Sequence, residues 1–134
     1  MGADFYFYAT TLKGTPREAL TALRQEVFNK GEFRGAHLKP RSPEHAVKLT
    51  HPDGTASILD ISVIGDEPDY FTASPLTDEE LEDYFGSTKP TLEVIKRDCT
   101  VVADGIGRGT ARYLVAYDDE GKASHYVFMG YSFD

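Results

Sequence analysis

TARYLVAY (residues 110–117) and ASHYVFMGYSF (residues 123–133) are the two stretches of sequence that decide the fold. Both are rich in the β-branched and aromatic residues that favour strands. The polar segment 118–122 (DDEGK) lies between them and is typical of a hairpin loop. We therefore expect an antiparallel hairpin here, and the other elements are placed around it.

Upstream, the clearest signals are one further strand and two helix starts. Residues 3–12 (ADFYFYATTL) are apolar on both sides, which suits a strand covered on both faces. Thr15 with Glu18, and Thr77 with Glu80, have the spacing of a capping box, so each pair predicts the start of a helix. Glycines end these helices, at Gly31 and Gly86.

The segments between these elements are less clear. Residues 31–46 form a long basic loop in this interpretation, and residues 46–51 and 55–64 form a hairpin about the turn Pro52-Asp53-Gly54. Residues 65–75 are expected to be a loop. Residues 91–103 are compatible with a helix followed by a short strand at 101–102, or with one long strand.

This order predicts a single α+β domain over residues 1–134. We expect a mostly antiparallel sheet of about five to six strands, with two to three helices packed on one face. No apolar run is long enough to span a bilayer, and the N-terminal MGADFY lacks the features of a secretory signal. The single cysteine, Cys99, fits a reducing compartment, so we expect a cytoplasmic protein.

Charge is distributed very unevenly along the chain. The forty residues Leu49–Thr88 contain no Lys or Arg, and the formal net charge is −10 here against −8 for the whole chain. The carboxylates of this acidic block are Asp53, Asp60, Asp66, Glu67, Asp69, Asp78, Glu79, Glu80, Glu82 and Asp83. Such a block affects which partners the surface attracts.

Half of these acids have a local explanation. Asp53 suits a turn, Asp60 suits the solvent face of a strand, and residues 78–80 suit the first turn of a helix. The rest define a partner-binding surface together with nearby aromatic residues. Its predicted members are Asp66, Glu67, Asp69, Tyr70, Phe71, Glu82, Asp83 and Tyr84.

The main hypothesis is a small acidic interaction protein that binds a basic protein partner in an inhibitory or toxin-neutralising (immunity-like) role. A solvated acidic face is the simpler explanation of the same residues. The basic loop 34–41 could also neutralise the surface within the molecule.

Two further functions are compatible with the sequence. A small-molecule-binding domain or small enzyme would have a pocket between the sheet and the helices, with His51, Asp60, Cys99 and His125 as candidate catalytic or polar groups. A structural subunit would self-associate through the aromatic residues of the C-terminal hairpin. No catalytic motif is present, so we favour a protein that is not an enzyme.

No cofactor, metal or nucleic acid is expected. The acidic segment 66–69 lacks the spacing of a calcium loop, and the histidines lack that of a zinc site. Segment 105–110 (GIGRGT) precedes a predicted strand, whereas a dinucleotide fingerprint opens a helix. Arg108 and Arg112 are too few to bind nucleic acid in so acidic a chain.

Overall fold

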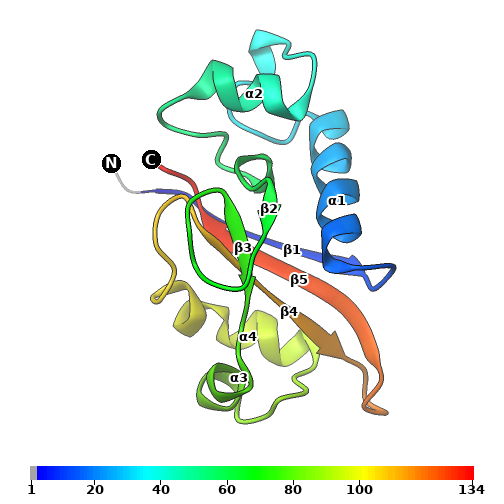
Figure 1. The fold of residues 1–134 in the computed structure, drawn as a ribbon. Helices are drawn as coiled ribbons and strands as arrows, with labels where there is room; N and C mark the ends of the chain where they lie inside the picture. The colour runs from blue at the N-terminus through cyan, green and yellow to red at the C-terminus, as the bar shows by residue number, and fades with distance from the viewer. Residues whose placement is uncertain (1–2) are drawn as a thin grey trace.

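The computed structural model describes residues 3–134 and contains a five-stranded sheet (Figure 1). Its strands are β1 (Phe5–Thr11), β2 (Val63–Ile64), β3 (Thr72–Pro75), β4 (Ala111–Tyr117) and β5 (Ala123–Tyr131). They are arranged in the order β1-β5-β4-β3-β2. The predicted C-terminal hairpin is confirmed, because β4 and β5 pair antiparallel. The prediction that the N-terminal MGADFY is not a secretory signal includes Met1 and Gly2. These two residues lie outside the described part of the chain.

Four α-helices occur in the part of the chain that the structure describes, so the expectation of two to three is too low, because residues 43–50 are also helical. They are α1 (Pro16–Lys30), α2 (Pro43–Thr50), α3 (Asp78–Phe85) and α4 (Leu92–Ala103). Both predicted capping boxes are confirmed, at Thr15 for α1 and at Thr77 for α3. Each of these two helices ends at a glycine with positive φ, as the sequence predicts. None of the helices within residues 3–134 has the length and apolar character needed to cross a membrane.

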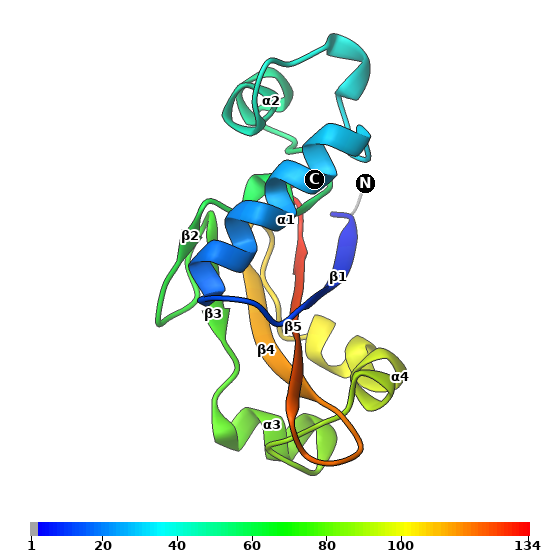
Figure 2. The same cartoon turned by 90° about the vertical axis from the view of Figure 1, so that its right-hand side faces the viewer.

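Helices cover both faces of the sheet, so the prediction that they pack on one face is wrong. Alternate residues of the central strands belong to two separate apolar clusters: Tyr126 and Phe128 pack with α1, whereas Val127 and Met129 pack with α3 and α4. In Figure 1, α1 and α2 lie above the strands, and α3 and α4 lie below them. Figure 2 shows the same separation from the side. The central residues of β5, Tyr126–Met129, are the physical reason, because they are apolar on both sides of the strand and must be buried on both faces.

The sheet is mixed, which corrects the expectation that it is mostly antiparallel. Strand β3 pairs parallel with β4, and β2 pairs parallel with β3. Residues 72–75, expected to lie in a loop, therefore form a strand. A parallel pair requires the chain to return to the start of the next strand. The connecting residues 65–71, which we call the β2–β3 loop, make this return at the surface.

The predicted hairpin over 46–51 and 55–64 is wrong. Residues 43–50 form α2, whose start is fixed by Ser42: its hydroxyl accepts a hydrogen bond from the N–H of His45, and Pro43 occupies the first turn. This helix also shortens the predicted basic loop. Residues Ile58–Asp60 form a buried 3₁₀ turn instead of part of the predicted second strand.

Residues 92–103 form one continuous helix, α4, so the expected strand at 101–102 is wrong. Thr91 caps the helix by accepting a hydrogen bond from the N–H of Val94. Ile95, Cys99 and Val102 are spaced at i, i+4 and i+7 and pack on the same apolar cluster. Helical burial of this stripe outweighs the strand preference of the two valines.

Candidate functional site

Asp60 is the most unusual polar residue of the protein. Its side chain is buried, with 1% of the residue exposed, so the prediction that it occupies the solvent face of a strand is wrong. Oδ1 accepts hydrogen bonds from the N–H of Thr55 at 2.8 Å and from its hydroxyl at 2.9 Å. Oδ2 is buried and has no hydrogen-bond partner among residues 3–134. A buried carboxylate is rarely left half paired.

Asp60 lies against a cavity of about 140 Å³, which we call the Asp60 cavity. It is lined by Val47, His51, Pro52, Gly54, Asp60, Phe71 and Phe133. The structure therefore brings together two of the four candidate catalytic or polar groups, His51 and Asp60. Most of the remaining lining is apolar, and this combination of an apolar wall with few polar groups is typical of ligand sites.

The backbone holds the two aromatic walls in place. Phe71 has a φ of 61°, a left-handed conformation that is unfavourable for a phenylalanine. Its N–H donates to the carbonyl of Gly109 at 2.9 Å, which ties this strained residue to the segment preceding β4. The Phe133 ring lies 5.3 Å from the Phe71 ring, and the N–H of Asp134 donates to the carbonyl of Asp53.

Burial raises the pKa of the Asp60 carboxyl above its ordinary value. The hydrogen bonds from Thr55 and the positive charges of Arg34 and Arg24 act in the opposite direction, but burial outweighs them. Neither arginine donates a hydrogen bond to Asp60 in the described structure: Arg24 bonds to the Leu59 carbonyl, and Arg34 to Asp4 and to backbone carbonyls. The ionised carboxylate thus lacks a cationic donor in contact.

This pKa predicts a pH-dependent stability difference between the native protein and Asp60→Asn. Above the raised folded-state pKa the buried charge destabilises the native protein, and this penalty disappears as pH falls through that pKa towards the ordinary value of 3.8. The variant cannot titrate at this position. Urea unfolding from pH 7.5 downwards should therefore show native stability rising relative to the variant.

Asp53→Asn is the control for this measurement, because Asp53 is an exposed carboxylate of the adjacent turn. The Asp53→Asn measurement shows how much of the pH dependence comes from replacing any carboxyl group of this segment. A difference for Asp60→Asn that changes with pH no more than that of the control would contradict the raised pKa of Asp60.

The predicted partner-binding residues of the β2–β3 loop form an exposed group. Asp66, Glu67 and Asp69 are exposed, and Tyr70 and Phe71 have 62% and 44% of their surface exposed. Tyr70 packs 5.7 Å from the ring of Phe133. An open hollow of about 650 Å³, lined in part by Asp69, Tyr70, Arg108 and Phe133, adjoins this group. Phe133 is thus shared by the hollow and the Asp60 cavity.

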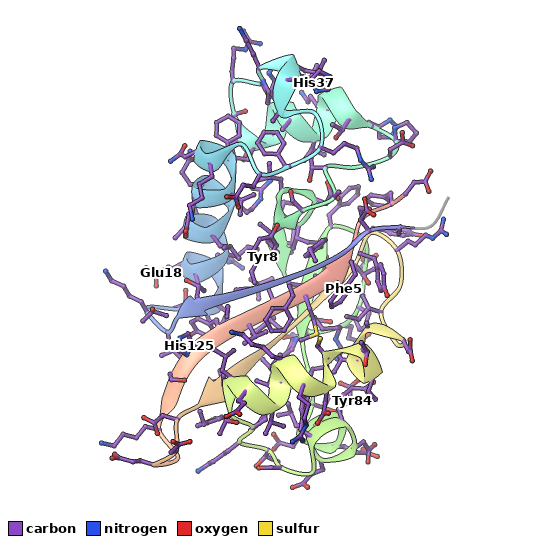
Figure 3. The ribbon with its side chains drawn as sticks, turned by 180° about the vertical axis from the view of Figure 1, so that it is seen from behind. Phe5, Tyr8, Glu18, His37, Tyr84 and His125 are labelled. Carbon is purple, nitrogen blue, oxygen red and sulfur yellow. The ribbon has the colours of Figure 1, made fainter. Side chains whose placement is uncertain are left out.

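The other predicted partner-binding residues belong to α3. Glu82 and Asp83 are exposed, whereas Tyr84 is half-buried and packs edge-on against Phe85. Figure 3 shows Tyr84 on the same side of the sheet as α4, and Figure 1 places α3 at the end of the molecule away from α2. The hollow beside Tyr70 is lined by no residue of α3. The predicted surface therefore consists of two groups on different elements.

Cys99 and His125 do not join the Asp60 cavity. Cys99 is half-buried on α4, on the opposite face of the sheet. His125 lies on β5 (Figure 3), where its Nδ1 is 2.9 Å from the Ser124 hydroxyl, and it does not line the Asp60 cavity. Within residues 3–134, no three His, Cys, Asp or Glu side chains gather to form a candidate metal site.

The acidic block makes few internal ion pairs. Of its ten carboxylates, only Glu80 forms an ion pair among the described residues, with Arg112 at 2.6 Å. Arg34 of the basic loop pairs instead with Asp4 at 2.7 Å. The basic loop thus makes no ion pair with the β2–β3 loop in the part of the chain that the structure describes.

Sequence reasoning missed several residues that build the Asp60 cavity. Phe133 was expected only as part of the aromatic hairpin, and Gly54 only as a turn residue. Thr55, which holds Oδ1 of Asp60, was not singled out. One signal for the cavity was available in the sequence: Gly54 and Thr55 precede Asp60, an acid inside an apolar segment, by six and five residues. This pattern alone is not specific for a buried carboxylate.

Comparison with known proteins gives no relative for this arrangement: no family model, curated protein or solved structure matches the chain. The candidate function therefore depends on the chemistry of the β2–β3 loop and the Asp60 cavity alone.

Proposed function

We propose that this protein binds a basic protein partner through the β2–β3 loop, in an inhibitory or toxin-neutralising role. The observation that carries the proposal is the exposed aromatic pair Tyr70 and Phe71, which lies beside carboxylates that form no ion pair with any residue of 3–134. Tyrosine and phenylalanine are enriched at the centre of protein interfaces. Acidic groups around them would speed the encounter with a basic protein.

The acidic face of α3 is a second, separate part of the proposed surface. Glu82 and Asp83 would add to the long-range attraction, whereas Tyr84 is too enclosed to be a central contact. A cytoplasmic location remains part of the proposal, on the basis of the single cysteine.

The charge on the β2–β3 loop can be tested by neutralising Asp66, Glu67 and Asp69 as Asn, Gln and Asn. The partner would be captured from an extract of the native host, purified, and measured for its association rate at several salt concentrations. We expect the triple variant to associate about tenfold more slowly at low salt, with a weaker salt dependence.

A matched control neutralises three exposed acids elsewhere, Asp104, Asp119 and Glu120, and changes the net charge equally. This control should retain most of the native association rate, since its acids lie outside the proposed contact. Equal slowing of the two triple variants, or a captured partner that is itself acidic, would refute the proposed surface.

A small-molecule-binding role is the second candidate function. The Asp60 cavity supports it, because a buried polar group within a mostly apolar cavity is typical of ligand sites. The absence of Cys99 and His125 from this cavity gives no support to a catalytic role for the four residues together.

A further inference from the structure

The two oxygens of the Asp60 carboxylate have different environments. Oδ1 already accepts two hydrogen bonds from Thr55. Oδ2 is buried and accepts none from the described residues. A buried charged oxygen without a donor is costly, so a ligand that donates to Oδ2 would gain binding energy by meeting this demand.

Oδ2 is directed towards Gly54, which also lines the Asp60 cavity. A Cβ atom at position 54 would lie only 2.7 Å from Oδ2 and 3.3 Å from the carboxyl carbon. Because residue 54 is a glycine, no side-chain atom of that residue covers the free oxygen on this side. Glycine is often used where a ligand must approach closely.

The walls of the cavity are suited to an alkyl chain. Val47, Pro52, Phe71 and Phe133 provide apolar surface, and the volume of about 140 Å³ admits only a small group. Aromatic rings near a cation also attract it through their negatively polarised faces. The ligand expected here combines a slender apolar stem with a positively charged donor.

We propose that the Asp60 cavity binds a primary alkylammonium group, which donates a hydrogen bond to Oδ2 of Asp60 while its alkyl chain lies against Phe71 and Phe133. An ammonium fits better than a guanidinium. The guanidinium fork binds both oxygens of a carboxylate, and here Oδ1 is already used twice. An ammonium would also place a positive charge in contact with a carboxylate to which neither Arg24 nor Arg34 donates a hydrogen bond in the described structure.

Two sources of this group share the same chemistry: a free small amine, or the lysine side chain of a protein. The test titrates the full chain with n-butylammonium, and follows backbone amide NMR signals of Gly54, Thr55 and Phe71. Parallel titrations use n-butanol, butylguanidinium and a lysine capped at both backbone ends. We expect n-butylammonium to shift these signals saturably and to bind at least about tenfold more tightly than n-butanol.

Asp60→Asn should weaken n-butylammonium binding at least about tenfold, whereas the control Asp53→Asn should leave it nearly unchanged. The comparison of n-butylammonium with n-butanol uses the native protein and remains decisive if Asp60→Asn does not fold. If capped lysine binds, the alkylammonium group comes from the lysine side chain of a protein. If n-butylammonium binds but capped lysine does not, the ligand is a free amine.

Three results would overturn the proposal. The first is equal binding of n-butanol and n-butylammonium, which would make the site merely apolar. The second is tighter binding of butylguanidinium than of n-butylammonium. The third is the absence of saturable shifts at the cavity residues with every probe, which would leave only solvent as the occupant. None of these measurements depends on the proposed protein partner.

Discussion

Glu80→Ala should lower the free energy of unfolding by about 2–4 kcal/mol, because it leaves the buried guanidinium of Arg112 without its counter-charge. The Arg112 side chain is 11% exposed and donates to both oxygens of Glu80, at 3.0 and 2.6 Å. Its remaining hydrogen bonds go to the carbonyls of Ser74 and Pro75. The Glu80 side chain is itself 29% exposed, so solvent screening places the expected loss below that of a fully buried pair.

Glu80 has a second structural role at the start of α3. Its Oε1 accepts a hydrogen bond from the N–H of Thr77 at 2.9 Å and so completes the capping box. One side chain therefore joins the helix start to β4, on which Arg112 lies. Glu80 therefore has a long-range role in addition to the role at the helix start that the sequence predicts.

Glu79→Ala is the matched control, because Glu79 is exposed in the same helical turn and forms no ion pair among the described residues. It should lose no more than about 0.5 kcal/mol, measured by urea unfolding at neutral pH. Equal losses for the two variants would show that the Arg112 pair does not stabilise the fold.

The pH dependence of the Glu80 pair has a defined sign. The hydrogen bond from Arg112 is the main reason that the pKa of Glu80 lies below its ordinary value of 4.5. Its stabilisation is therefore fully present above that ordinary value and is lost as pH falls through the lowered folded-state pKa. The stability gap between the native protein and Glu80→Ala should narrow in that acidic range.

Local signals made part of the fold predictable. The starts of α1 and α3 followed from the spacing of Thr15 with Glu18 and of Thr77 with Glu80, because a capping box involves only neighbouring residues. The start of α2 carried a similar signal in Ser42 and Pro43, but the surrounding basic and glycine-containing segment favoured a loop. The turn at 52–54 then favoured a hairpin that the chain does not form.

Long-range packing determined what the sequence could not predict. The two-sided apolar pattern of residues 3–12 correctly indicated a strand covered on both faces, since Tyr6 and Phe7 pack in different clusters. A strand that is apolar on both sides needs cover on both faces of the sheet, so the expected placement of all helices on one face was inconsistent with this pattern. Strand β3 is too short to show alternation, and its parallel pairing with β4 joins segments separated by two helices.

The Asp60 cavity was unpredictable for the same reason. Its walls come from α2, the turn at 52–54, the β2–β3 loop and the segment after β5. The alternation of Asp60 with its apolar neighbours resembles the solvent face of a strand. The structure instead buries this carboxylate beside Phe71 and Phe133, which are distant from it in the sequence.

Gly54→Ala should lower the free energy of unfolding by about 2–4 kcal/mol, for two reasons that can be separated. Gly54 has a φ of 89°, which is unfavourable for alanine. The new methyl group would also lie 2.7 Å from Oδ2 of Asp60. The carboxylate cannot move aside freely, because Thr55 holds Oδ1 through two hydrogen bonds.

Gly86→Ala separates the two effects. Gly86 has a similar φ of 74°, but a Cβ there would meet no atom within 4 Å. This control should lose only about 1–2 kcal/mol from backbone strain. The Asp60→Ala variant has no carboxylate for the new methyl group to meet. In that variant, Gly54→Ala should therefore lower the free energy of unfolding by no more than Gly86→Ala does in the native protein.

Urea unfolding of Gly54→Ala, Gly86→Ala, Asp60→Ala and the double variant Gly54→Ala/Asp60→Ala therefore measures how rigidly the Asp60 side chain is held. A loss for Gly54→Ala that exceeds the loss for Gly86→Ala by at least about 1 kcal/mol, and that disappears with Asp60→Ala, would establish a fixed carboxylate facing Gly54. Such a carboxylate is preorganised for a ligand, since binding requires no further ordering. Equal losses for the two glycine variants would instead mean that Asp60 shifts easily, and the single free oxygen would no longer favour an ammonium over a guanidinium.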